Sequence, residues 1–307
     1  MNRFAFLLCI GIVSATNGAN AESVLKTEKL ADNVYALIGP TTDRDPQNLG
    51  NNANFGVIVT DAGVVLVDPG GSYKGAKMIH DTVRAITGDP IALVINTGGQ
   101  DHRWLGNGFF KALGAHIIAN EQAVNDQKAR LQDQRLGMEN SIGSDGFMGT
   151  EPVYADETFA EHKILTVGDI RIELHHAGHA HTPGDSFVWL PKQEIVFAGD
   201  IVYTDRMLGI GPQSAHRSWI AAYEAVADKQ PKIVVGGHGR PADLSKATAD
   251  SYDYLIFLRK AVHAFIDEGH GMEEIGKIDQ SRFRYLDNFD ALKGRNAQRV
   301  FEELEWE

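Results

Sequence analysis

Three glycine-flanked segments carry side chains that can bind a metal ion or move a proton. His181 lies in the segment from Gly178 to Asp185, Asp200 follows Ala198-Gly199, and His238 follows Gly236-Gly237. Glycine lets the backbone turn sharply, so side chains from separate strand ends can converge. Imidazole and carboxylate groups are common zinc ligands. These residue types therefore predict a metal site assembled from segments that are far apart in the sequence.

A fourth segment, residues 96–107, reads Asn-Thr-Gly-Gly-Gln-Asp-His-Arg-Trp-Leu-Gly-Asn and directly follows a predicted buried strand. His102 is its one imidazole. Arg103 cannot bind a metal, because a guanidinium stays protonated and has no lone pair to give. The segment therefore offers a mixture of ligands and one fixed positive charge, from Gln100, Asp101, His102 and Arg103.

Strands that alternate with helices must position these segments, and this alternation predicts an α/β fold. A loop is expected at 137–150, either as a plain connector or as a cover over a site. No linker is visible, so we expect one domain over residues 22–307. Strands are predicted at 34–38, 54–59, 64–67, 91–95, 115–118, 171–175, 187–190, 194–198 and 232–235, and helices at 74–86, 106–113, 121–138, 218–228, 243–267 and 288–305.

Taken together, five ordered blocks resemble the metallo-β-lactamase superfamily. The resemblance implies an αββα four-layer sandwich built from two related halves, with the site at one edge of the paired sheets. The most similar branch is that of exported members, including the zinc hydrolases found beside quinoprotein and sulfur-oxidation systems. The blocks are 64–70, 96–107, His181-Thr182-Pro183-Gly184-Asp185, Ala198-Gly199-Asp200 and Gly236-Gly237-His238-Gly239.

The family signature after Asn-Thr is His-x-His-x-Asp-His, followed by two residues and Gly-Asn. The same number of residues separates Asn96-Thr97 from Gly106-Asn107 here. A gapless register places Gly98 and Gln100 at the first two histidines, His102 at the aspartate and Arg103 at the last histidine. A shifted register would pair Asp101-His102 with the family Asp-His, but it needs a deletion and a compensating insertion within ten residues.

In the gapless register, the resemblance implies a poor first metal site. Only His181 remains there, with Gln100 as a weak amide ligand. The second site keeps three ligands, His102, Asp200 and His238, with water completing a tetrahedron. We therefore expect one ion, zinc by preference, with iron or manganese as alternatives.

Arg103 admits two interpretations. It could hold a carboxylate, sulfonate or phosphate of the substrate, or the oxyanion that develops during the reaction. Alternatively, it could form a salt bridge with Asp101, Asp185 or Asp200 that only supports the former site.

A bound zinc would lower the pKa of its water to around 7 and supply hydroxide at neutral pH. Asp200 would then bind the ion and orient its water, and His181 or Asp101 would carry away the proton of that water. His175 and His179 are expected to support the ligating imidazoles. This predicts a hydrolase that acts on a small ester, thioester or lactone. If Arg103 binds an anion, the substrate carries an anionic group.

Two alternative functions exist for this combination of residues. A metal-free member of the fold could act as a binding module or a redox-pathway accessory protein, an alternative favoured by Gly98, Gln100 and Arg103. An ordinary dizinc β-lactamase is disfavoured, because the loop lacks ligands for two tight sites.

The remaining features concern export and partners. Arg3, the apolar run 4–13 and Ala19-Asn20-Ala21 predict a signal peptide over residues 1–21, and hence a periplasmic or secreted protein. Cys9, the one cysteine, lies in that segment, so thiol chemistry is not expected in the mature chain. The net charge of −12, without a basic cluster, argues against nucleic-acid or membrane partners and leaves a small-molecule substrate.

Overall fold

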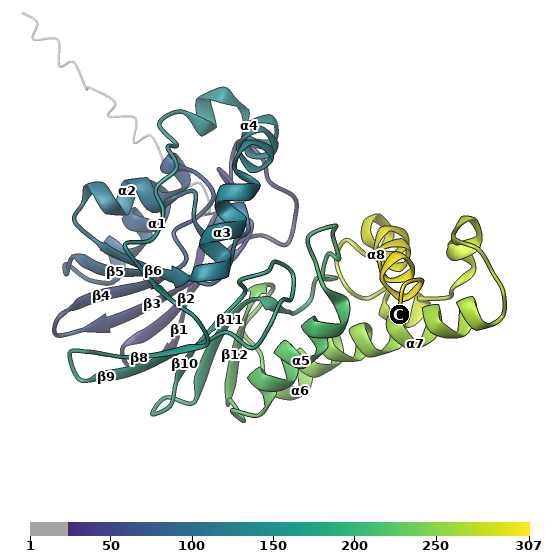
Figure 1. Ribbon diagram of the computed structural model, residues 1–307. Coiled ribbons are helices and arrows are strands. Elements are labelled where there is room, and N and C mark those ends of the chain that lie inside the picture. Colours follow the sequence, from purple (N-terminus) through teal and green to yellow (C-terminus); the bar gives the residue numbers. More distant parts are fainter. Residues whose placement is uncertain (1–23) are drawn as a thin grey trace, which may run out of the picture.

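The computed structural model describes residues 24–307, and the expected signal peptide lies outside them. Two sheets face each other (Figure 1). The first has seven strands in the order β1 (Lys26–Ala31), β2 (Val34–Ile38), β3 (Asn54–Thr60), β4 (Gly63–Val67), β5 (Ile91–Asn96), β6 (His116–Asn120) and β7 (Glu157–Phe159). The second has five in the order β12 (Ile233–His238), β11 (Ile195–Tyr203), β10 (Phe187–Leu190), β9 (Ile170–His175) and β8 (His162–Val167).

Three apolar layers hold the sandwich together. Side chains from the facing sheets, such as Ile58 and Phe197, form the central layer. Ile79 belongs to a layer between the first sheet and its helices, and Trp219 to a layer between the second sheet and its helices. The helices are α1 (Tyr73–Ile86), α2 (Asn107–Ala112), α3 (Glu121–Ala129), α4 (Leu131–Phe147), α5 (His216–Ala227), α6 (Leu244–Ala247), α7 (Asp253–Asp267) and α8 (Phe289–Leu304).

The predicted αββα sandwich is confirmed, and most predicted elements are present with ends shifted by a few residues. The strands β1, β7 and β8 were not predicted. The single helix expected at 243–267 consists of α6, a π-helical turn at Thr248–Tyr252 and α7. Among the described residues, no helix is long and apolar enough to cross a membrane.

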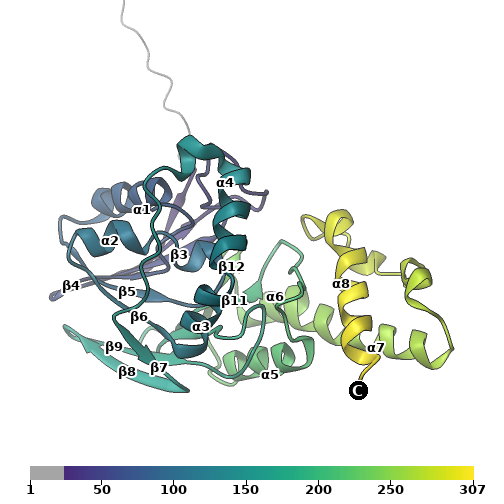
Figure 2. The same cartoon turned by 45° about the horizontal axis from the view of Figure 1, so that its top comes forward.

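The loop expected at 137–150 was wrong, because α4 continues to Phe147. Met138, Ile142 and Phe147 pack in one cluster with Trp104, and burial of these side chains holds the stretch as a helix despite its glycines. Gly143, with φ of 79°, breaks the helical geometry near its end. This helix therefore covers the segment that carries the candidate ligands, as Figures 1 and 2 show for its position above the sheets.

The strand expected to end at 198 continues to Tyr203, which places Asp200 inside β11. The β11–β12 pairing shifts register on both sides of Gly199. Gly199 has φ of 51°, in the left-handed region that glycine adopts without strain. This irregularity separates Asp200 from the regular alternation of the strand and allows its carboxylate to face the first sheet.

A buried histidine in α5 predicts a pH-dependent stability. His216 is 0% exposed, and burial lowers its pKa to about 4. The unfolded chain, with a pKa near 6.5, therefore binds the proton more tightly, so the stability contributed by neutral His216 is present above pH 6.5 and is lost as pH falls toward 4. Between pH 7 and pH 4, the free energy of unfolding should fall by up to roughly 3 kcal/mol more in the wild type than in the His216→Phe variant.

Urea unfolding of both proteins between pH 4 and 7 measures the difference, with His216→Leu as a second non-titrating variant. Parallel pH profiles for the wild type and both variants would contradict the assignment. The comparison between proteins isolates His216 from the other titrating groups.

Candidate metal centre

The side chain of Arg103 lies between the two sheets and is 1% exposed. Its Nε and Nη2 groups donate to Asp200 Oδ2 and Oδ1 at 3.0 and 2.7 Å. Nη1 donates to Asp68 Oδ2 at 2.9 Å and to the Asn54 carbonyl at 3.1 Å, and Nη2 also donates to the Gly237 carbonyl at 3.1 Å. All five N–H groups of the guanidinium are thus engaged by the protein.

This arrangement bears on the two interpretations of Arg103. With every N–H engaged and the side chain buried, no donor is left for a substrate carboxylate or an oxyanion. The expected salt bridge with Asp200 is present, and Asp68 is a second partner that was not predicted. The geometry therefore favours the supporting role of Arg103 over the anion-binding role.

The paired charge keeps Asp200 ionised. Burial opposes ionisation, but Arg103 and then His102 together hold the pKa of Asp200 well below its usual range. Gly237 is needed beside this pair, because a Cβ there would lie 2.5 Å from both Arg103 Nη2 and Asp200 Oδ1. The carboxylate is therefore available as an anionic ligand at neutral pH.

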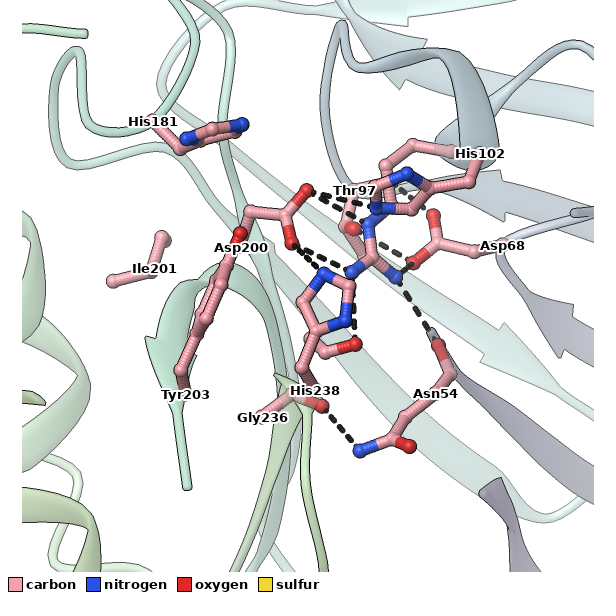
Figure 3. A network of polar contacts seen from close by, with 12 residues as sticks. Asn54, Asp68, Thr97, His102, His181, Asp200, Ile201, Tyr203, Gly236 and His238 are labelled. Atoms are coloured by element: carbon pink, nitrogen blue, oxygen red, sulfur yellow. Dashed lines mark hydrogen bonds and ion pairs between the residues drawn. The ribbon is translucent and has the colours of Figure 1, made fainter. Parts of the chain in front are cut away.

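His102, Asp200 and His238 converge on one point, and each can offer one ligand atom within 4.8 Å of the others. His102 Nε2 lies 3.3 Å from Asp200 Oδ2, and His238 Nε2 lies 3.5 Å from Asp200 Oδ1. Figure 3 shows the imidazoles of His102 and His238 next to the Asp200 carboxylate. The three ligands expected for one metal ion are thus brought together from three segments.

Both imidazoles are oriented through their other ring nitrogen. His238 Nδ1 lies 2.7 Å from the Asn52 carbonyl, which accepts its proton and leaves Nε2 with a free lone pair. His102 Nδ1 lies 3.1 Å from Asp101 Oδ1 and 2.9 Å from Arg44 Nη2. Such partners fix the ring orientation of metal-binding histidines.

These residues fit a zinc-like ion. Ligands 2.0–2.1 Å from a tetrahedral zinc lie about 3.4 Å from one another, and each imidazole lies near that distance from one oxygen of the Asp200 carboxylate, His102 from Oδ2 and His238 from Oδ1. His102 Nε2 is buried and has no hydrogen-bond partner, although buried polar atoms are rarely left unpaired. Burial and then the Arg206 charge lower the pKa of His238 well below its usual range, so its imidazole is neutral, as a ligand requires.

His181 lies apart from this cluster, beyond Asp200 in Figure 3. Its Nδ1 is 2.9 Å from the Gly209 carbonyl, and burial lowers its pKa to about 4. Its side chain lines a cleft of about 490 Å³ together with His102 and His238. His181 therefore faces the space beside the cluster as a neutral imidazole whose Nε2 makes no hydrogen bond within residues 24–307.

Asp101 and Gln100 are placed differently from each other. Asp101 is buried, forms an ion pair with Arg44, and accepts a hydrogen bond from the His102 backbone at 2.7 Å. Burial opposes ionisation, but Arg44 and His102 lower the pKa of Asp101, which makes it a weak proton acceptor. Gln100 lines the cleft, with its Oε1 3.4 Å from Arg130 Nη1.

Residue 98, which the gapless register places at the first histidine of the family signature, has no room for a side chain. A Cβ on Gly98 would lie 2.4 Å from Asp185 Oδ1. Asp185 is buried and accepts hydrogen bonds from the backbone and hydroxyl of Thr182, and its burial raises its pKa to about 8. A histidine at position 98 would therefore require this buried carboxyl group to move.

Sequence reasoning missed Arg44, Asp68 and Asn52. Asp68 carried a signal, because it directly follows a predicted strand, whereas nothing in the sequence around Arg44 indicated a site. The predicted support of the imidazoles by His175 was wrong, because His175 pairs with Glu173 on β9.

Known proteins resemble this chain over the same elements. The family model described as the metallo-beta-lactamase superfamily matches residues 49–238. A "Metallo-beta-lactamase type 2" of Elizabethkingia meningoseptica is 25% identical over 240 residues, which cover 77% of this chain and 87% of that protein.

Solved structures share the fold. A metallo-beta-lactamase from Pontibacter korlensis superposes with a TM-score of 0.61 at 19% identity, over 76% of this chain and 99% of the other. The DIM-1 metallo-beta-lactamase gives a TM-score of 0.56 at 19% identity, over 76% and 97%. At these identities the likeness concerns the fold alone.

Proposed function

This chain belongs to the metallo-β-lactamase superfamily, and from that premise we propose that it is a hydrolase with a single-metal centre at His102, Asp200 and His238. The observation that carries the proposal is the convergence of these three buried side chains, whose ligand atoms lie within 4.8 Å of one another and include His102 Nε2, a buried nitrogen without a hydrogen-bond partner. When bound, zinc supplies Lewis acidity that polarises a carbonyl and acidifies water.

The residues of the chain would supply the remaining functions. Asp200, held ionised by Arg103, offers a ligand with a fixed orientation. His181 is held by the Gly209 carbonyl and lines the cleft, so its position allows it to accept a proton from a group beside the cluster. Arg103 would stabilise the metal ligand Asp200 without contacting the substrate. We expect a small ester, thioester or lactone as the substrate.

Metal content tests this proposal directly. The mature protein purified after metal-supplemented expression should contain about one equivalent of zinc, iron or manganese by elemental analysis. The His238→Ala variant should contain less than about a tenth of an equivalent, because one of three protein ligands is lost. The His263→Ala variant removes an exposed histidine on α7 and should keep the metal.

Metal below about a tenth of an equivalent in the wild type would refute the hydrolase and favour a metal-free binding or accessory protein. A panel of lactam, thioester, lactone and sulfur-ester substrates then identifies the reaction.

We also propose that residues 22–307 form one domain that is exported after cleavage of the signal peptide. Amino-terminal sequencing of the exported protein tests this.

A further inference from the structure

The cleft beside the candidate metal centre has a wall that lies outside residues 49–238. Leu292 and Arg295, both on α8, line the same cleft as His102 and His238. Figures 1 and 2 place α8 with α7 beside the sandwich, beyond α5 and α6. The C-terminal helices therefore contribute directly to the space that a substrate would occupy.

This wall is fixed firmly to the loop that forms the rest of the cleft. Polar side chains along one face of α8, spaced by three or four residues, all bond the backbone of residues 208–217. The backbone of α8 therefore has a defined position beside this loop. The contacts are Asn296 with Ile210 N and Leu208 O at 2.9 and 2.8 Å, Arg299 with Gly211 O and Ser214 O at 3.2 and 3.3 Å, and Glu303 with His216 N and Arg217 N at 2.8 and 3.0 Å.

Arg295 presents an unneutralised charge in this cleft. It forms no hydrogen bond or ion pair with another residue of the described chain, 24–307. A Cβ on Gly209 would lie 3.6 Å from Arg295 Nη2, which places the guanidinium against the backbone that also orients His181. A guanidinium in this place is available to an anion.

Arg206 is a second cation in the cleft, and its guanidinium is only partly engaged. Its side chain is 12% exposed, and its ion pair with Asp43 is long, at 4.0 Å, to a carboxylate that is 93% exposed. The amide oxygen of Asn288 accepts from its Nε and Nη2 at 3.1 and 3.3 Å, which leaves Nη1 for another partner. Arg206 and His238 line the same cleft. By contrast, the third cleft arginine, Arg44, is paired with buried Asp101.

Asp43 is thus the one acidic residue that lines a cleft containing three arginines, in a protein of net charge −12. We propose that Arg206 and Arg295 form a subsite for an anionic group of the substrate. Guanidinium groups bind carboxylate, phosphate and sulfonate oxygens through paired hydrogen bonds. This assignment rests on the proposed function in one respect. It takes the bound anion to be part of the substrate whose reacting bond lies at His102, Asp200 and His238.

Anion binding by the full mature chain tests the subsite. Acetate, inorganic phosphate and methanesulfonate are titrated separately by calorimetry, with and without EDTA, and their order of affinity identifies the anionic group. At least one should bind saturably in EDTA, and Arg295→Ala should weaken it about tenfold, because a charged donor pair is lost. Arg206→Ala combined with Arg295→Ala should abolish binding.

Arg217→Ala is the matched control, since Arg217 is an exposed arginine on α5 that does not line the cleft. It should bind the anion like the wild type. Unchanged affinity in the Arg295→Ala and double variants, or no saturable binding by the wild type, would overturn the subsite. Metal content separates the two proposals, because Arg295→Ala should keep the metal and EDTA-treated protein should keep the anion.

Discussion

Replacing Arg103 with alanine should lower the free energy of unfolding by about 3–5 kcal/mol, because a buried charge pair loses one partner. Asp68 and Asp200 would remain buried, each without its strongest neutralising contact. The backbone carbonyls of Asn54 and Gly237 would also lose donors that water cannot easily replace. Urea unfolding in EDTA measures the change without a contribution from bound metal.

Arg103→Lys should give an intermediate loss, since an ammonium keeps the charge but cannot reproduce five donors in a fixed plane. The exposed Arg217→Ala should change the free energy of unfolding by less than about 0.5 kcal/mol. If Arg103→Ala folded with wild-type stability and lost anion binding instead, the supporting role assigned to Arg103 would be wrong. The same experiment therefore tests both interpretations of the side chain.

The second large effect concerns which histidines hold the metal. His102→Ala should weaken zinc binding by about 100-fold or more, because a ligand is lost outright, whereas loss of a supporting contact costs 10–100-fold. His181→Ala should keep its zinc and lose turnover of whichever substrate the panel identifies. Competition with a chromogenic chelator measures the affinity of both variants.

Zinc retained by His102→Ala but lost by His181→Ala would contradict the assignment and place the ion at the first-metal position of the family. The packing around Gly98 argues against that outcome, since the Asp185 carboxyl group occupies the space where a ligand would project. Asp101→Asn serves as an intermediate case. It keeps the ligands but weakens the support of His102, so a smaller loss of affinity is expected.

The C-terminal helices change how specificity is expected to arise. In the sequence, the one candidate for holding an anion was Arg103, the cation inside the signature loop. The structure directs that guanidinium into the protein and leaves Arg206 and Arg295 facing the cleft. Arg206 and Arg295 would thus recognise the substrate, whereas Arg103 would support the metal ligand Asp200. Substitutions of these arginines can separate the two roles.

The sequence by itself determined the fold and the identity of the candidate ligands. Alternating apolar strands and helices follow from local periodicity, and the blocks around His181, Asp200 and His238 are short enough to be recognised without contacts. The predicted layers and most elements are present for that reason. The loop at 137–150 failed because burial of Ile142 and Phe147 outweighed the weak helix propensity of its glycines.

Only the tertiary structure decided how the charges are paired. Arg103 and Asp200 are 97 residues apart, and Arg44 and Asp101 are 57 apart, so no local pattern indicates which carboxylate meets which guanidinium. The strength of each pairing depends on burial and distance, which are set where β4, β5, β11 and β12 meet. The same holds for Arg295, whose place in the cleft follows from the packing of α8 against residues 208–217.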